Sequence, residues 1–295
     1  MTGETKVIGN EATGNFWLYT RAKGFDLTHP RSPTSPPIHP RIRLETSNTP
    51  IEIAPQKTAL VVVDMQNFFV SRSIGRRGEC HDAEEKLLKY GIPAARKAGI
   101  QVIWLNWGLT EAELEDMSPS MLRVFRFARR HDPGKVTSKE TWTDTGMGEP
   151  LGELTLSDGK KVNMGRLFMR GEWNAALHSP LEGAYQSSLH TDLPDVKLHK
   201  NRVSGVCDSS SELADYLNQR NHIKTLLFTG VNTDQCVFGT LHDASLKGWD
   251  TVLLKDGCGT TSPDFASRMS LYNCSTIWGF VSTCEQLFHG VQNMQ

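Results

Sequence analysis

One cysteine stands where the chain could place a nucleophile. Cys236 follows an apolar run, residues 226–229, and a short polar turn that begins at Gly230. We expect the run to be a buried strand and Cys236 to open the next helix. A helix N-terminus favours a thiolate through its dipole, and its unpaired backbone N–H groups can hold an oxyanion. The segment therefore predicts a nucleophile and an oxyanion site, against the alternative that Cys236 merely packs there.

Two more polar residues follow expected strands in the same way. Asp64 ends the apolar run 58–63, and Lys200 ends a short run that begins at Val196. Ligands of open parallel sheets bind outside the carboxyl ends of the strands. Taken alone, Asp64 could be a turn or capping residue and Lys200 a solvated charge. Together with Cys236 they predict a reactive site at one edge of a sheet.

The order of these segments resembles the isochorismatase-like cysteine hydrolases. The resemblance runs from about Ile51 to about Phe288 and is strongest for the ureidoacrylate amidohydrolase branch. It rests on the motifs Val63-Asp-Met-Gln-Asn67, Val102-Ile-Trp-Leu-Asn-Trp-Gly108, Gly171-Glu-Trp-Asn174, Lys200-Asn-Arg-Val-Ser-Gly205, Leu227-Phe-Thr-Gly230, Cys236-Val237 and Trp278-Gly-Phe280. It implies an α/β fold with a parallel sheet and helices on both faces, a Rossmann-like three-layer sandwich.

The resemblance also implies a chemistry. Cys236 would attack the carbonyl of a small ureido or amide substrate and form a thioester, with Asp64 as general acid and base and Lys200 as charge stabiliser. The backbone N–H groups of Asn232 and Cys236 would hold the oxyanion. The family pattern further implies a cis peptide bond between Val231 and Asn232.

Six residues are expected near the substrate. Gln66 and Asn67 follow Asp64 and could orient it or close the site, and the tryptophans among the six could equally belong to the core. Val203 stands where the family usually has an aromatic residue, so the family substrate does not transfer directly. The expected substrate contacts are Gln66, Asn67, Asn106, Trp107, Trp173 and Val203.

No metal or other cofactor is expected. Nicotinamidases of the superfamily carry an Asp and histidines soon after the first strand, but residues 106–110 here read Asn-Trp-Gly-Leu-Thr. The ten histidines are scattered, with no pair at ligand spacing.

Strand and helix patterns alternate from about residue 51 onward, which predicts a parallel sheet. We expect strands over 58–63, 101–106, 196–199, 223–229, 250–255 and 275–280, and helices over 82–98, 110–130, 209–220, 236–248, 263–273 and 283–291. Residues 131–195 read as an irregular covering excursion. The sequence predicts an N-terminal extension, 1–50, and a hydrolase domain, 51–295.

Composition agrees with a cytoplasmic enzyme that acts on a small molecule. The net charge of the 295 residues is −1, without a long basic block, which argues against a nucleic-acid or membrane partner. The six cysteines show no disulfide-framework spacing, so we expect reduced thiols. The aromatic residues Phe16, Trp17 and Tyr19 predict that the extension packs on its own or a neighbouring subunit of a homo-oligomer, a dimer or tetramer.

Two other functions share this pattern. A vinyl-ether hydrolase of the isochorismatase type would have the same fold, but enzymes of that kind usually lack the nucleophilic cysteine. A non-catalytic binding protein of the same fold would have no chemical reason to combine Asp64, Lys200 and Cys236.

Overall fold

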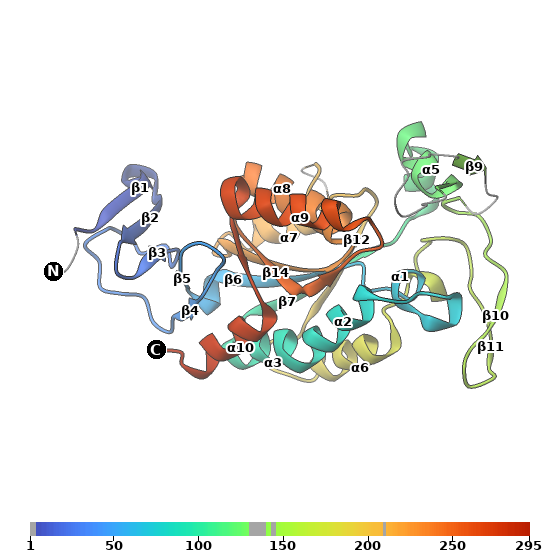
Figure 1. Ribbon diagram of the computed structural model, residues 1–295, viewed down its shortest axis with the longest axis horizontal. Coiled ribbons are helices and arrows are strands. Elements are labelled where there is room, and N and C mark those ends of the chain that lie inside the picture. The colour runs from blue at the N-terminus through green and yellow to red at the C-terminus, as the bar shows by residue number, and fades with distance from the viewer. Residues whose placement is uncertain (1–3, 130–139, 143–145, 209–210) are drawn as a thin grey trace.

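The computed structural model describes residues 4–129, 140–142, 146–208 and 211–295. Three parts follow one another along its long axis: a small N-terminal sheet, a central α/β body and a peripheral excursion (Figure 1).

The central sheet has six strands, all parallel, in the order β12-β7-β6-β13-β14-β15. Their bounds are β6 (Thr58–Val63), β7 (Gln101–Trp107), β12 (Val196–Lys200), β13 (Thr225–Val231), β14 (Asp250–Gly259) and β15 (Phe280–Ser282). Every residue of β6, β7 and β13 is buried, as expected for inner strands of a parallel sheet covered on both faces.

Helices cover both faces of this sheet (Figure 1). One face carries α2 (Glu79–Lys86), its continuation through Leu87–Gly91 into α3 (Ile92–Ala98), α6 (Ser179–Ser188) and α10 (Cys284–Gln292). The other carries α7 (Glu212–Gln219), the turn η6 (Thr233–Val237), α8 (Phe238–Leu246), α9 (Asp264–Asn273) and the turn η7 (Cys274–Trp278). The three-layer α/β architecture predicted from the sequence is therefore confirmed.

Three local predictions were wrong. The strand expected over 275–280 begins only at Phe280, because residues 274–278 form a helical turn and Gly279 then passes against Thr251. A Cβ atom at residue 279 would lie 2.1 Å from the Thr251 carbonyl oxygen, so only glycine fits this approach. The irregular excursion contains helix α6, and the single helix expected over 110–130 is interrupted before Pro119.

The excursion between β7 and α6 consists of short elements. They are α4 (Glu111–Glu115), α5 (Pro119–Arg126), β8 (Phe127–Arg129), β9 (Glu140–Trp142), β10 (Glu153–Thr155), β11 (Lys161–Asn163) and the turn η5 (Trp173–Ala175). Thr110 and Glu113 form a capping box at the start of α4. The excursion returns to the carboxyl end of the sheet, where Leu109 pairs with Met169.

The N-terminal residues form a sheet of their own, in the order β1-β2-β3-β5-β4. Its strands are β1 (Lys6–Asn10), β2 (Asn15–Thr20), β3 (Gly24–Asp26), β4 (Ile42–Leu44) and β5 (Ile51–Ile53). This sheet packs on the core of its own subunit: the Trp17 indole donates to Asp250 over 2.8 Å, and its ring lies 5.7 Å from Phe280. Because β5 pairs with β3, the sheet continues past residue 50.

We expect a substitution in this sheet to destabilise the whole protein. Ile42 is fully buried in the same apolar cluster as Leu287 of α10, so Ile42→Ala should cost about 2–5 kcal/mol and lower the melting temperature by several degrees. Ile8→Ala, at a side chain that is 43% exposed, is the matched control and should change little. Equal melting temperatures for the two variants would show that the N-terminal sheet is only loosely attached.

Candidate active site

The structure brings Asp64, Lys200 and Cys236 together at the carboxyl ends of three strands. Asp64 follows β6, Lys200 ends β12, and Cys236 lies in the turn η6 after β13. The Lys200 Nζ atom lies 3.0 Å from Asp64 Oδ2 and 3.4 Å from Cys236 Sγ. All three residues are buried. They are called the Asp–Lys–Cys cluster below.

An unusual backbone conformation aims Asp64 at its partners. Its φ angle is +54°, a left-handed value that costs a non-glycine residue about 1–2 kcal/mol. The Asp64 N–H donates to the Leu105 carbonyl, and Asp64 Oδ1 accepts from the Trp107 N–H over 3.1 Å. The bend breaks the strand alternation and directs the carboxylate toward Lys200.

Lys200 is held by two contacts besides its ion pair. Its Nζ atom donates to the Arg202 carbonyl over 3.1 Å and lies 3.9 Å from the ring centroid of Trp107. Lys200 and Trp107 are directly paired in neighbouring parallel strands, so their side chains share one face of the sheet. The Lys200 ammonium group therefore makes a cation–π contact with the Trp107 indole.

The pKa shifts in the cluster favour a protonated Cys236 thiol beside an Asp64 carboxylate of increased basicity. Burial raises the pKa of Asp64, although Lys200, Cys236 and Trp107 each lower it. Burial likewise raises the pKa of Cys236 to about 12; Lys200 lowers this pKa and Asp64 raises it. A thiol with such a pKa needs a base at the moment of attack, and a carboxylate of raised pKa is well suited to take its proton.

Cys236 sits inside the first turn of its helix and not at its first residue. The helical turn begins at Thr233, three residues earlier than expected, with Asn232 as the preceding cap residue. The peptide bond between Val231 and Asn232 is cis. The Thr240 hydroxyl donates to the Cys236 carbonyl over 2.7 Å and fixes this turn to α8.

Gln66 and Asn67, expected near the substrate, use their amides to tie the site's loops together. The Gln66 amide accepts from the Trp107 N–H and donates to the carbonyls of Trp107 and Ala175, at 2.7–2.9 Å. Asn67 donates to the Trp173 carbonyl over 2.8 Å. These contacts join β6, β7 and the excursion beside the Asp–Lys–Cys cluster.

Asn106 lies on the face of β7 opposite to Trp107. Along β7 the side chains of Leu105 and Trp107 face the apolar layer that contains Cys236, whereas Trp104 faces the opposite layer. Strand alternation places Asn106 with Trp104. Because adjacent residues of a regular strand point to opposite faces, Asn106 and Trp107 lie on different faces of β7, and the expected contact of Asn106 with substrate stays a prediction.

Trp107 contacts the Lys200 side chain of the cluster. The sequence did not predict which residues pack around Trp107. The indole N–H of Trp107 is buried and makes no hydrogen bond of normal geometry, and the nearby Trp107 lowers the pKa of Cys236. Trp173 lies in η5, half-buried, and Val203 packs beside α8, with its Cγ1 atom 3.3 Å from the place where Gly239 would carry a Cβ atom.

An aromatic cover lies over Trp107. The Phe168 ring stacks on Trp107, with centroids 5.4 Å apart, and on Phe69, 5.5 Å apart; Phe68 and Phe125 meet it edge-on. Phe168 has a φ angle of +59°, and its N–H donates to Asn174 Oδ1. Sequence reasoning missed this cover because its members are dispersed between residues 68 and 168 with no shared motif.

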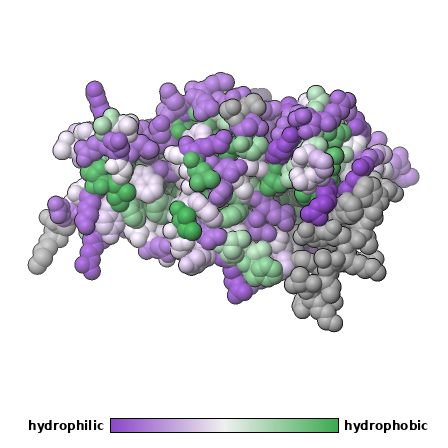
Figure 2. All heavy atoms as spheres, turned by 90° about the horizontal axis from the view of Figure 1, so that it is seen from above, coloured by the Kyte–Doolittle hydropathy of each residue, from purple (hydrophilic) through white to green (hydrophobic). Residues whose placement is uncertain are grey.

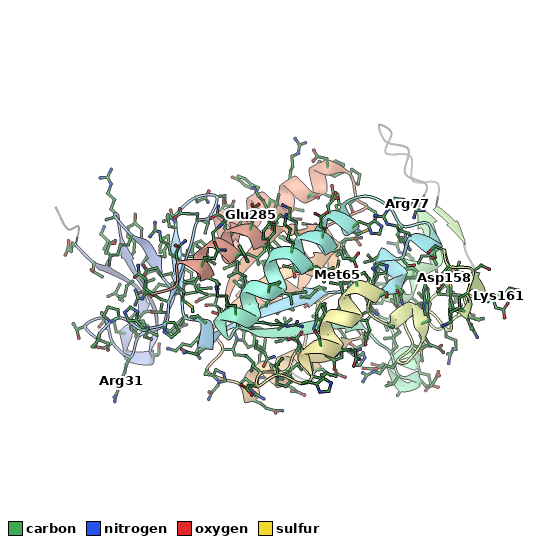
Figure 3. The ribbon with its side chains drawn as sticks, turned by 90° about the horizontal axis from the view of Figure 1, so that it is seen from below. Arg31, Met65, Arg77, Asp158, Lys161 and Glu285 are labelled. Carbon is green, nitrogen blue, oxygen red and sulfur yellow. The ribbon has the colours of Figure 1, made fainter. Side chains whose placement is uncertain are left out.

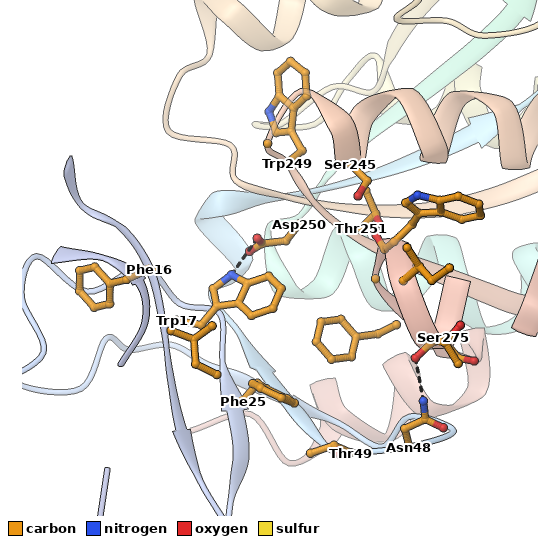
Figure 4. A pocket seen from close by; sticks show the side chains of 18 of the residues that line it. Phe16, Trp17, Phe25, Asn48, Thr49, Ser245, Trp249, Asp250, Thr251 and Ser275 are labelled. Atoms are coloured by element: carbon orange, nitrogen blue, oxygen red, sulfur yellow. Dashed lines mark hydrogen bonds between the residues drawn. The ribbon is translucent and has the colours of Figure 1, made fainter. Parts of the chain in front are cut away.

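A cavity of about 530 Å³ lies at the other end of the sheet. It lies between the N-terminal sheet and the start of β14, and its walls include Trp17, Phe25 and Trp249 (Figure 4). Asp250, at its edge, is the first residue of β14 and bonds to Trp17 and His29. This cavity is thus separate from the carboxyl ends that carry the cluster.

Within the described residues, no group of three His, Cys, Asp or Glu side chains is arranged to hold a metal ion. The same residues contain no helix that is both long and apolar enough to span a membrane.

Comparison with known proteins agrees with this geometry. The isochorismatase domain family model matches residues 58–286. Ureidoacrylate amidohydrolase RutB of Caulobacter vibrioides (strain NA1000 / CB15N) is 28% identical over 263 residues, covering 87% of this chain and 94% of that protein. RutB of Yersinia enterocolitica is 30% identical over 244 residues, covering 80% and 90%.

Solved structures share the fold at lower identity. A cysteine hydrolase from Pseudomonas syringae has a TM-score of 0.57 at 17% identity and covers 88% of this chain and 99% of its own. An isochorismatase-like hydrolase from Alkaliphilus metalliredigens has a TM-score of 0.53 at 20% identity, covering 79% and 98%. The matching family model spans most of the chain and includes Asp64, Lys200 and Cys236, and the chain therefore belongs to the isochorismatase family.

Proposed function

We propose that this protein is a cysteine-dependent amidohydrolase that cleaves a C–N bond, other than a peptide bond, in a small ureido or amide substrate. The observation that carries the proposal is the position of Lys200 Nζ, within 3.4 Å of both the Asp64 carboxylate and the Cys236 thiol. The RutB relatives, which are ureidoacrylate amidohydrolases, support the same reaction class.

In the first half-reaction the Cys236 thiol gives its proton to Asp64 while Sγ attacks the substrate carbonyl carbon. The resulting tetrahedral oxyanion would be held by the backbone N–H groups of Asn232 and Cys236. Asp64 then hands its proton to the leaving nitrogen, the C–N bond breaks, and an acyl thioester remains on Cys236. Lys200, in contact with both residues, offsets the negative charge that moves between Asp64 and Cys236.

In the second half-reaction water replaces the amine. Asp64, again a carboxylate, takes one proton from the water as the oxygen attacks the thioester carbonyl. Collapse of the tetrahedral adduct breaks the C–S bond, and the proton on Asp64 returns to sulfur as the acid product leaves. The raised pKa of Asp64 suits a group that accepts and donates a proton in each half-reaction.

Trp107 is expected to assist through its unpaired indole N–H. Trp107→Phe keeps a ring beneath Lys200 but removes the donor, so the pKa of Cys236 should rise and turnover should fall about tenfold or more. The pH dependence of Cys236 alkylation measures the first effect. Trp249→Phe, at the distant cavity, is the matched control; a Trp107→Phe variant that behaves like it would remove Trp107 from the mechanism.

The reaction is expected to need no metal ion. Prolonged treatment with EDTA followed by buffer exchange should leave turnover unchanged. A loss of activity that zinc, iron or manganese alone restores would contradict this expectation.

A turnover screen tests the reaction class directly. It should cover ureido acids, carbamoyl amino acids, biuret, nicotinamide and isochorismate, scored for ammonia and for pyruvate. Ammonia from a ureido or amide compound supports the proposal. Pyruvate from isochorismate would instead support the vinyl-ether hydrolase, and no turnover together with tight ligand binding would support a binding protein.

We further propose a cytoplasmic homo-oligomer. The described cysteines are all free thiols, as a reducing compartment would keep them. Large apolar side chains lie exposed on α8, α9 and η7, on the side of the molecule where Figure 2 shows apolar patches among polar residues. They are Leu246, Phe265, Met269, Tyr272 and Ile277. Light scattering should give the mass of a dimer or tetramer, and a monomer mass at micromolar concentration would contradict the assembly.

A further inference from the structure

Arg170 binds a glycine that joins the carboxyl ends of β7 and β12. Its Nε–H donates to the Gly108 carbonyl over 3.0 Å, and the Gly108 N–H donates to the Lys200 carbonyl over 3.1 Å. The backbone N–H of Arg170 also donates to the Leu109 carbonyl over 3.0 Å. Gly108 follows Trp107, whose ring contacts the Lys200 ammonium group. The guanidinium is therefore one hydrogen bond from the backbone that joins these two residues.

Two carboxylates on the same guanidinium hold the residues on either side of the cluster's lysine. Arg170 Nη1 lies 2.8 Å from Glu212 Oε1, and Nη2 lies 3.3 Å from Glu113 Oε2. Glu212 Oε2 accepts from the His199 N–H over 2.6 Å, and Glu113 Oε1 accepts from the Asn201 side-chain amide over 2.9 Å. His199 and Asn201 directly precede and follow that lysine in the chain. One guanidinium is thus linked, through two carboxylates, to both of its neighbours.

The charges around Arg170 make both carboxylates depend on it. Burial raises the pKa of Glu113, but hydrogen bonds and the charge of Arg170 bring it below its usual value, so Glu113 is ionised at neutral pH. Burial and the charge of Arg170 lower the pKa of His199, although Glu212 raises it, so the imidazole is uncharged near neutral pH. Glu212 therefore has Arg170 as its charged partner. Loss of Arg170 would remove the cation that lies between two like charges.

The excursion that carries Arg170 extends away from the central body. Figure 3 shows Asp158 and Lys161, which belong to its β10–β11 hairpin, at one end of the molecule and Arg31 of the N-terminal region at the other. Arg170 lies where the excursion returns to the carboxyl end of the sheet. Its contacts with the end of β7, with α4 and with the start of α7 join this returning segment to the elements around the cluster.

We propose that Arg170 is a positioning residue, which holds Lys200 at its distances from the other two members of the Asp–Lys–Cys cluster. It acts through Gly108, Glu113 and Glu212, and it takes no part in the bond changes of the reaction. The inference rests on the proposed function for the reaction that Arg170 serves, and it assigns to the excursion a role in that reaction.

Arg166 offers a closely matched control within the same excursion. Its Nε–H donates to the Gly148 carbonyl over 2.7 Å, and its guanidinium pairs with Glu111 of α4. The side chain of Arg166 is 40% exposed and that of Arg170 is 35% exposed. Neither Gly148 nor Glu111 adjoins Lys200 in the chain. Ion pairs this exposed contribute little to stability, so both Arg→Gln variants should fold and melt close to the wild-type protein.

The rate at which iodoacetamide alkylates Cys236 at one pH tests the proposal without a substrate. Lys200 lowers the pKa of Cys236, so a displaced Lys200 should raise this pKa and slow alkylation. Arg170→Gln should slow alkylation about fivefold, less than Lys200→Ala does. Arg170→Lys should restore part of the rate because it keeps the charge but loses the forked geometry, and Arg166→Gln should leave the rate unchanged.

The decisive comparison repeats the measurement in a Lys200→Ala background. If Arg170 acts through Lys200, Arg170→Gln should slow alkylation of the wild-type protein and add nothing to the effect of Lys200→Ala. A general disturbance of the fold would slow it in both backgrounds. With a substrate from the turnover screen, Arg170→Gln should lower kcat about tenfold and leave KM within about twofold.

The inference and the proposed function can fail separately. Equal alkylation rates for Arg170→Gln and Arg166→Gln, or an equal effect of Arg170→Gln with and without Lys200, would overturn the positioning role even if Cys236→Ser is inactive. If Arg170→Gln slows alkylation only where Lys200 is present but Cys236→Ser still turns over substrate, the positioning role stands and the thioester mechanism fails.

Discussion

Cys236→Ser is expected to lose at least about a thousandfold of turnover while keeping the fold and the affinity for substrate. Serine preserves the size of the side chain, but its hydroxyl is far less acidic than a thiol, and its alkoxide would be a poor leaving group when water attacks the acyl intermediate. The buried position makes this substitution more severe, because desolvation already raises the pKa of Cys236 to about 12. Steady-state kinetics and a thermal melt measure the two quantities.

The control for this variant is another cysteine of the same chain. Cys258 is buried between Phe228 and Leu254, and Cys207 is exposed; neither contacts the Asp–Lys–Cys cluster. Cys207→Ser should therefore retain full turnover and Cys258→Ser should change stability more than kcat. Equal losses for Cys236→Ser and Cys258→Ser would point to a folding effect.

Asp64→Asn and Lys200→Ala are each expected to abolish turnover, and the double variant should be little worse than either one. Lys200 pairs with Asp64 and also contacts Cys236, so the removal of either charged group should disrupt the whole cluster. A double variant that loses the product of the two single losses would show that they act independently.

The same two variants should move the reactivity of Cys236 in opposite directions. Asp64 raises the pKa of Cys236, so Asp64→Asn should lower it and speed alkylation at neutral pH. Lys200 lowers the pKa of both Cys236 and Asp64, so Lys200→Ala should raise both and slow alkylation. Any residual acid limb of kcat/KM in Lys200→Ala should accordingly lie at higher pH. Alkylation rates that change in the same direction for both variants would contradict the assigned charges.

The Asp–Lys–Cys cluster could be predicted because each of its residues lies at the end of a strand or just after one. The runs before Asp64 and Cys236 are apolar, as buried parallel strands are, whereas the run before Lys200 is mixed and half-buried. The carboxyl ends of parallel strands in one sheet meet at one edge, so all three residues come together there. The order of the strands in the sheet was not predicted, since an apolar run carries no information about its neighbours in the sheet.

What the sequence could not supply was the detail that depends on distant contacts. The left-handed conformation of Asp64 is enforced by Leu105 and Trp107, more than forty positions away. The face of Asn106 depends on the phase of β7, which is buried on both sides and shows no polar alternation. The N-terminal sheet was not predicted, because its strands are short and β3 pairs with β5 on the far side of the proline-rich segment.

The central claim is an acyl thioester on Cys236, and quenched mass spectrometry tests it most directly. Enzyme mixed with a substrate from the turnover screen is stopped with acid within one turnover, digested, and mapped. We expect the Cys236 peptide to gain the mass of the acyl group, the gain to vanish in Cys236→Ser, and hydroxylamine to remove it. An acyl group on another residue, or full turnover by Cys236→Ser with no adduct, would contradict the account.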